Sequence, residues 1–78
     1  MKIDIEQSKR IYQKLTKREL DILELISQGK SFNQMAYELN IQTGTIKNLM
    51  RNARNRTGCE TSTEIVHHMS VYLTSRIK

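Results

Sequence analysis

Residues 45–56 carry basic and amide side chains at a spacing that suits contact with nucleic acid. Lys47, Arg51 and Arg54 stand at positions i, i+4 and i+7, so they share one strip if the segment is helical. Arginine and lysine donate hydrogen bonds to guanine O6 and N7, and asparagine can make a bidentate contact with adenine. Together with Asn48, these side chains could read base edges in a major groove, while surplus charge meets phosphates.

The charge of the chain is concentrated in the same region. The 78 residues have a formal net charge of +5, yet all eight acidic residues lie within 4–38 or 60–64. The cations of the acid-free stretch 39–59 are Lys47, Arg51, Arg54 and Arg56. Such a segment attracts polyanions, because counterions are released when phosphates bind. An ordinary solvated basic face is the alternative interpretation of a basic run taken alone.

Four segments of the chain show the apolar period of a helix. Three of them open with a capping box, in which a hydroxyl residue is followed three positions later by Glu or Gln. These boxes begin at Thr16, Ser31 and Thr61. Gly29 and Gly58 follow two of the segments and are expected to end them in a left-handed conformation. We predict an all-α fold of four helices, with residues 1–14 as a short fifth helix or a partly ordered arm.

The segments 31–40 and 43–57 have the spacing of a helix-turn-helix. Ala36 supplies a small residue where the two helices cross. Asn40 stands where the chain must turn sharply, and asparagine tolerates the left-handed region better than other non-glycine residues. Ile41 is expected to fill the turn. The helix-turn-helix spacing as a whole makes the second segment the recognition helix, from about 45 to 56.

The two faces of this recognition helix follow from its period. The expected inner residues are Ile46, Leu49, Met50 and Ala53. The expected outer residues are Lys47, Asn48, Arg51, Asn52, Arg54 and Asn55. Thr43 is the expected N-cap, although no acid follows it three residues later. An outer face without carboxylates predicts DNA contact.

At this point the motifs resemble the LuxR-type (GerE-like) helix-turn-helix DNA-binding domain. Leu15-Thr16-Lys17-Arg18-Glu19 fits the family's L-T-x-R-E, and Thr45-Ile46-Lys47-Asn48 is similar to its T-V-K-N-H. The resemblance covers about 15–70, so we expect 15–78 to form the domain. It implies a four-helix unit whose third helix enters the major groove and whose last helix pairs two copies. The short length is similar to that of the family's stand-alone regulators.

Carried over by position, the resemblance implies base-reading roles for Lys47, Asn48 and Arg51. It implies phosphate contacts near Ser31, Asn33 and Thr45, and we add Thr43, Arg54 and Asn55 as further expected contacts to the DNA backbone. Three positions depart from the family pattern. Leu49, Thr57 and Gln42 stand where His, Leu and Ser are usual. We expect Thr57 to loosen the end of the recognition helix, and the preferred DNA sequence to differ from that of other members.

The last segment has two faces. The residues expected to cover the core are Ile65, Val66, Met69, Tyr72, Leu73 and Ile77. A second strip of mostly small side chains comprises Thr63, His67, Ser70, Val71 and Thr74. Small residues allow close helix approach, so this strip is the predicted dimer interface. A merely exposed face is the alternative.

No metal or cofactor is expected. His67 and His68 are adjacent, so their side chains diverge by about 100° on a helix and cannot grip one ion. Cys59 is the one cysteine, with no ligand cluster expected around it, and is interpreted as core packing. Because no nucleophile–base pair or phosphate-cradling glycine loop is found, we do not expect an enzyme.

The sequence thus predicts a bacterial, sequence-specific regulator of transcription that binds double-stranded DNA as a homodimer. RNA polymerase or another regulator is a further expected partner. No apolar run is long enough to cross a bilayer and no signal-peptide core is present, so we expect a cytoplasmic, nucleoid-associated protein without a membrane partner. The alternative is a protein-interaction module, an antagonist or co-regulator that heterodimerises with a larger regulator without binding DNA.

Overall fold

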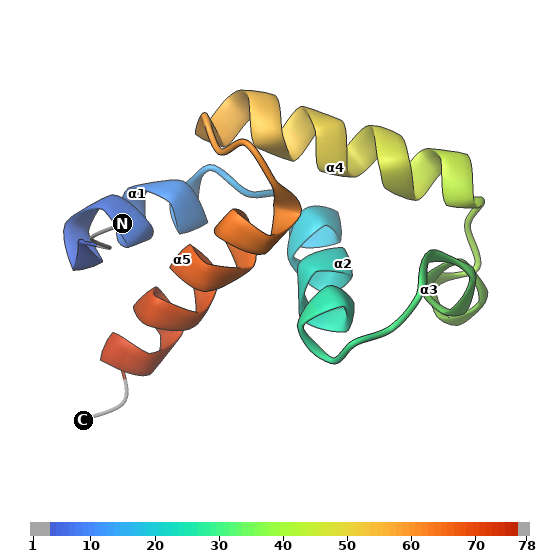
Figure 1. Ribbon diagram of the computed structural model, residues 1–78, viewed down its shortest axis with the longest axis horizontal. Coiled ribbons are helices and arrows are strands. Elements are labelled where there is room, and N and C mark those ends of the chain that lie inside the picture. The colour runs from blue at the N-terminus through green and yellow to red at the C-terminus, as the bar shows by residue number, and fades with distance from the viewer. Residues whose placement is uncertain (1–3, 77–78) are drawn as a thin grey trace.

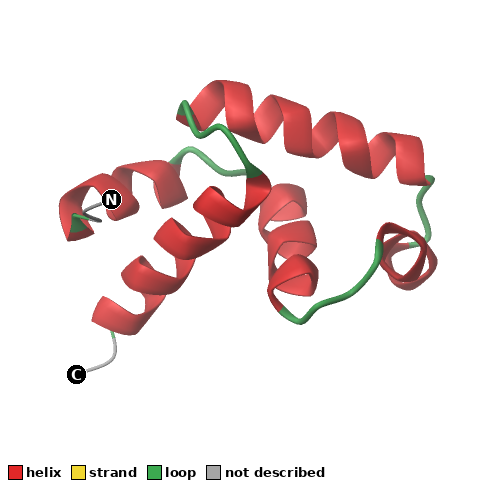
Figure 2. Ribbon diagram, viewed as in Figure 1, coloured by secondary structure: helices red, strands yellow, loops and turns green. Residues whose placement is uncertain are grey.

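The computed structural model describes residues 4–76, and this part of the chain forms five helices (Figure 1). They are α1 (Ile5–Gln13), α2 (Lys17–Ser27), α3 (Phe32–Leu39), α4 (Thr43–Thr57) and α5 (Ser62–Ser75). Residues 4–76 contain no strand, so the all-α prediction is confirmed (Figure 2). Of the two alternatives for residues 1–14, the short helix is the one observed over Ile5–Gln13, while residues 1–3 lie outside the described part of the chain. Within the same range, no helix is long and apolar enough to cross a membrane.

Two of the predicted capping boxes are confirmed. The Thr16 hydroxyl accepts a hydrogen bond from the Glu19 N–H at 3.2 Å, and the Glu19 carboxylate accepts from the Thr16 N–H at 2.9 Å. Ser31 and Gln34 exchange the same two bonds at 3.2 and 2.8 Å. These reciprocal bonds satisfy amides that have no partner inside the helix, which fixes the first residues of α2 and α3.

The third predicted capping box is only half formed. Thr61 accepts from the Glu64 N–H at 3.1 Å, but the Glu64 carboxylate accepts from the N–H of Glu60 at 3.0 Å rather than from that of Thr61. Gly29 and Gly58 have φ values of +82° and +77°. The predicted left-handed helix ends are therefore confirmed at both glycines.

The core lies where the helices meet around α5. This helix contacts α1, α2 and α4, while α3 is held against α4. The buried apolar residues are Ile11, Ile22, Leu23, Met35, Ile46, Met50, Ala53, Cys59, Ile65 and Met69. On α5 the predicted core face is confirmed for the buried Ile65 and Met69, with Val66 and Tyr72 half-buried. Leu73 is exposed instead, and Ile77 lies outside the described residues.

A buried hydrogen bond holds α1 on α5. Ser8 Oγ lies 2.9 Å from His68 Nδ1, and both side chains are buried. One turn further along each helix, the rings of Tyr12 and Tyr72 have centroids 4.8 Å apart. Ser8 and His68 satisfy each other's hydrogen-bonding groups where the two helices meet. This bond explains how His68 can be buried in the core, although the apolar pattern did not include it among the core residues.

Replacing Ser8 with alanine should lower the free energy of unfolding by about 1–3 kcal/mol, because one nitrogen of the buried imidazole loses its partner. Urea unfolding followed by far-ultraviolet circular dichroism measures the change. Lys9→Ala, an exposed neighbour on α1, is the matched control and should stay within about 0.5 kcal/mol of the parent. Equal unfolding midpoints for the two variants would show that the Ser8–His68 bond adds no stability.

Candidate nucleic-acid interface

The turn between α3 and α4 has the geometry that a helix-turn-helix requires. Asn40 adopts φ 56° and ψ 47°, the left-handed conformation expected of it. The N–H of Ile41 donates to the carbonyl oxygen of Ala36 at 3.1 Å, and the half-buried Ile41 side chain packs against the core. Since α3 also contacts α4, the chain turns sharply here and the two helices cross while staying packed against each other (Figure 1).

The predicted cap of α4 is wrong. Gln42 is the N-cap, with φ −82° and ψ 152°, and Thr43 is already the first helical residue. An N-cap needs an extended backbone, and Gln42 adopts it without a hydrogen bond from its side chain. The first turn of α4 also has no acidic residue. The amides at this end of the helix therefore have no side-chain acceptor.

The two faces of α4 agree with the helical period. Ile46, Met50 and Ala53 are buried and Leu49 is half-buried, which confirms the inner face. The exposed outer residues are Lys47, Asn48, Arg51, Asn52 and Asn55. Arg54 departs from the prediction because it is half-buried, and its Nη1 lies 3.4 Å from Ser62 Oγ at the start of α5.

The three residues expected to read bases lie together on the exposed surface. The guanidinium of Arg51 donates to the amide oxygen of Asn48 one turn earlier. Lys47 Nζ lies 6.0 Å from the centroid of the Phe32 ring, which stands at the start of α3. Phe32, Lys47, Arg51 and Arg54 line one open hollow between the helices. This surface thus joins both helices of the motif.

The expected backbone contacts flank this surface. Ser31, Asn33, Thr45 and Asn55 are exposed, while Thr43 is half-buried. The Ser31 hydroxyl accepts from the Gln34 N–H, so its own hydrogen stays available for an acceptor outside the protein. The N-termini of α3 and α4 therefore both present donors.

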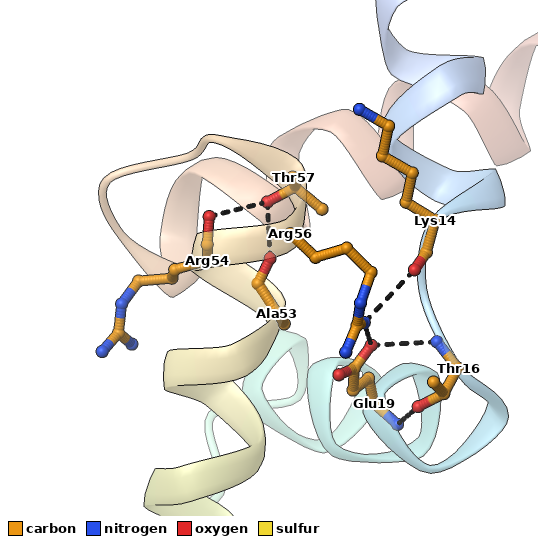
Figure 3. Close-up of polar contacts among 7 residues, drawn as sticks. All are labelled: Lys14, Thr16, Glu19, Ala53, Arg54, Arg56 and Thr57. Carbon is orange, nitrogen blue, oxygen red and sulfur yellow. Dashed lines mark hydrogen bonds and ion pairs between the residues drawn. The ribbon is translucent and has the colours of Figure 1, made fainter.

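Arg56, one cation of the acid-free stretch, is not part of the candidate DNA-binding surface. Arg56 Nη1 lies 2.6 Å from Glu19 Oε1 and 3.2 Å from the carbonyl oxygen of Lys14, whereas Arg54 points away from this pair (Figure 3). The Glu19 side chain is only 1% exposed. This pair was not predicted from the sequence, although Glu19 stands three and four residues before the apolar Ile22 and Leu23 and so shares their buried face.

Hydrogen bonds of the Thr57 side chain hold the end of α4, so the expectation that Thr57 loosens this end is wrong. The Thr57 hydroxyl donates to the carbonyl oxygen of Ala53 at 2.7 Å (Figure 3). The hydroxyl oxygen of Thr57 in turn accepts from the N–H of Cys59 at 3.4 Å, beyond the turn at Gly58. A side-chain hydroxyl thus replaces, by hydrogen bonding, the packing that leucine would give.

The predicted dimer strip lies on the surface of α5. Thr63, His67, Ser70 and Thr74 are exposed and Val71 is half-buried. The exposed Ile5 of α1 shares an open hollow with Ser70, Val71 and Thr74. Because α1 packs beside the strip, it adds an apolar side chain to this surface.

A group of potential metal ligands surrounds Cys59, where none was expected. His67 and His68 do diverge, one exposed and the other buried. However, one ligand atom each of Cys59, Glu64 and His68 lie within 4.8 Å of one another. The i, i+4 spacing of Glu64 and His68 is the signal for this group in the sequence. Burial raises the pKa of the Cys59 thiol, the charge of Glu64 raises it further, and the hydrogen bond with Thr57 opposes them.

A left-handed turn between two packed helices and a basic, acid-free outer face on the second define a helix-turn-helix domain of the DNA-binding class. The family model described as "Bacterial regulatory proteins, luxR family" matches residues 13–69, which is more than two thirds of the 78-residue chain. The protein belongs to this family, a family of regulators and not of enzymes. Comparisons with curated proteins and with solved structures gave no match.

Proposed function

We propose that the protein is a sequence-specific DNA-binding regulator of transcription that reads the major groove through the outer face of α4. The observation that carries this proposal is the exposed group of Lys47, Asn48 and Arg51 on a helix whose opposite face is buried. A helix anchored in this way can enter a groove as a rigid body and present three donors to base edges.

Each of these three side chains has a distinct role in the proposal. Arg51 contacts guanine O6 and N7, the commonest specific contact in major grooves, and Asn48 limits the motion of its guanidinium before DNA arrives. Lys47 contacts a neighbouring base or phosphate, with its ammonium group held near the Phe32 ring. The two contacts within the protein reduce the side-chain entropy lost on binding.

Contacts to the DNA backbone set the position of α4. Ser31 and Asn33 from α3, Thr43 and Thr45 at the start of α4, and Arg54 and Asn55 further along are the proposed set. The uncapped first turn of α4 supports it, because free amides and the positive end of the helix dipole both favour a phosphate. The half-buried Arg54 donates to Ser62 Oγ at 3.4 Å, and this hydrogen bond must break before Arg54 contacts a phosphate.

The proposal includes a two-fold dimer formed through the α5 strip of Thr63, His67, Ser70, Val71 and Thr74. Two-fold pairing places the two α4 helices on successive major grooves if they lie about 34 Å apart, one turn of the duplex. The strip is mostly polar, and Ile5 beside it adds apolar area to the interface. A pairing surface of this kind favours assembly on the DNA site.

Selection from a random duplex library tests the proposal. The parent should enrich a two-fold-symmetric motif. Lys47→Ala/Arg51→Ala should bind the enriched site about 30-fold or more weakly, taking at least about 1 kcal/mol for each lost base contact. Lys9→Ala/Arg10→Ala on α1 removes the same charge from an exposed site away from the start of α4 and should keep the motif (Figure 1).

Two outcomes would contradict base reading by α4, and a third would contradict the dimer. If both double variants weaken binding equally, only the net charge acts and α4 reads no sequence. If the parent enriches nothing, the favoured function becomes that of an interaction module which pairs with a larger regulator through α5. Enrichment of a single half-site would retain base reading by α4 and reject the dimer.

A further inference from the structure

The thiol of Cys59, the carboxylate of Glu64 and the imidazole of His68 converge at the junction of α4 and α5. One ligand atom from each lies within 4.8 Å of the other two. In a tetrahedral zinc site, bonds of about 2.0–2.3 Å place the ligand atoms roughly 3.3–3.7 Å apart. The three groups therefore need to close by only about 1 Å to share one ion.

Outer contacts orient two of these three groups. Ser8 Oγ holds His68 Nδ1 at 2.9 Å, which leaves Nε2 as the nitrogen available to an ion. The N–H of Glu60 donates to one Glu64 oxygen at 3.0 Å and leaves the other for coordination. Hydrogen bonds that fix the ring of a ligating histidine, and that hold a ligating carboxylate, are a regular feature of metal sites in proteins.

We propose that Cys59, Glu64 and His68 form a binding site for a divalent zinc-type ion, with a fourth position open to water or an external ligand. Thiolate and imidazole are the ligands that select zinc over magnesium or calcium, which prefer oxygen. Binding requires the thiol proton to leave to solvent, because thiolate is the ligand form. The inference does not depend on DNA binding by α4.

The ion connects three parts of the fold. Cys59 follows Gly58 at the end of α4, Glu64 and His68 lie on α5, and Ser8 on α1 supports the histidine. Metal binding is therefore expected to stabilise the α4–α5 junction and, through Ser8, the position of α1.

Titration of the reduced, full-length chain with Co²⁺ tests the site. We expect one Co²⁺ per chain, with a thiolate-to-cobalt charge-transfer band in the near ultraviolet and visible bands of a four-coordinate ion. One equivalent of Zn²⁺ should displace the cobalt and raise the Tm, whereas Mg²⁺ should do neither. A parent chain that shows no thiolate band overturns the proposal.

Variants assign the ligands. Cys59→Ala should abolish the charge-transfer band. Glu64→Gln keeps an oxygen for the Glu60 N–H and so preserves the local structure, but it should weaken binding by more than the 10–100-fold typical of an outer-shell loss. His67→Gln, an exposed neighbour on the same helix, is the control and should bind like the parent.

Far-ultraviolet circular dichroism establishes that each variant is folded under the titration conditions. If Cys59→Ala does not fold, Glu64→Gln decides the matter, because its half-buried side chain is replaced by one of nearly equal shape. Parent-like cobalt binding by a folded Glu64→Gln variant, or its loss in His67→Gln, would place the ion elsewhere and overturn the assignment.

Discussion

Replacing Ile46 with alanine should lower the free energy of unfolding by about 2–5 kcal/mol. Ile46 is fully buried on the inner face of α4, so truncation removes apolar contacts and leaves a cavity. At about 0.05–0.15 kcal/mol per residue, a chain of 78 residues has a total stability of about 4–12 kcal/mol. The variant should therefore lose a large part of its stability and be partly unfolded at temperatures where the parent is folded.

Urea unfolding at low temperature measures this loss, with Tyr37→Ala as the matched control. Tyr37 is an equally substantial side chain on the neighbouring α3 but is 88% exposed, so its removal should change stability by no more than about 0.5 kcal/mol. If the two substitutions shift the midpoint equally, α4 is not packed as described. At temperatures where Ile46→Ala remains folded, it should retain the sequence preference of the parent, because no base-reading side chain is altered.

Most of the fold could be predicted because its determinants are local. Apolar residues at helical spacing mark the buried faces, while Thr16 and Ser31 show where two helices begin. Asn40 and Gly58 mark left-handed ends and adopt φ values of 56° and 77°. Each of these signals depends on a few neighbouring residues, and the structure confirms them except at Leu73, which the apolar period placed on the core face and which is exposed.

The buried polar residues Ser8, Glu19 and His68, and their partners, could not be predicted in this way. Ser8 and His68 are 60 positions apart in the sequence, and Glu19 and Arg56 are 37 apart. Each of the three buried residues is by itself typical of a solvated surface, and only the tertiary packing supplies the partner that makes its burial favourable. Periodicity therefore identified the helices but not the distant partners that these polar residues have in the fold.

The candidate interface likewise contains residues that the helical period predicts and residues whose environment depends on other helices. Lys47, Asn48 and Arg51 lie on the exposed face that the period of α4 predicts. Arg54 and Arg56 belong to the same basic run, but they lie near the end of α4, where α2 and α5 approach. The neighbouring helices, which a single-helix projection does not include, supply these two cations with partners inside the protein.

Arg56→Met should lower the free energy of unfolding by about 3 kcal/mol, because it leaves the carboxylate of Glu19 buried without its cation. This lies at the low end of the range for broken buried pairs, since the Arg56 side chain is 41% exposed while that of Glu19 is only 1% exposed. After the substitution, the N–H of Thr16 at 2.9 Å remains as a donor to the carboxylate. One neutral donor compensates a buried charge poorly.

Replacing Glu19 instead of Arg56 should lower the free energy of unfolding by less. This difference between the two variants would identify the unpaired buried charge as the cause of the loss. Glu19→Gln keeps an oxygen for the Thr16 N–H and leaves Arg56 able to reach water, so we expect a loss of about 1 kcal/mol. The double variant should be more stable than Arg56→Met alone, because it contains no unpaired buried charge. If Glu19→Gln instead costs as much as Arg56→Met, the direct contact between the two side chains, and not an unpaired buried charge, determines stability.

Arg51→Met allows the structural role of Arg56 to be separated from the DNA binding expected of Arg51 on the same helix. Arg51 is exposed and contacts Asn48, so its replacement should change the free energy of unfolding by no more than about 0.5 kcal/mol while weakening binding to the selected DNA site by about fivefold or more. Arg56→Met, studied at a temperature where it is folded, should bind that site like the parent. Equal losses of DNA affinity in both variants would mean that Arg56 leaves Glu19 to contact a phosphate, and the buried pair would then be a feature of the free protein alone.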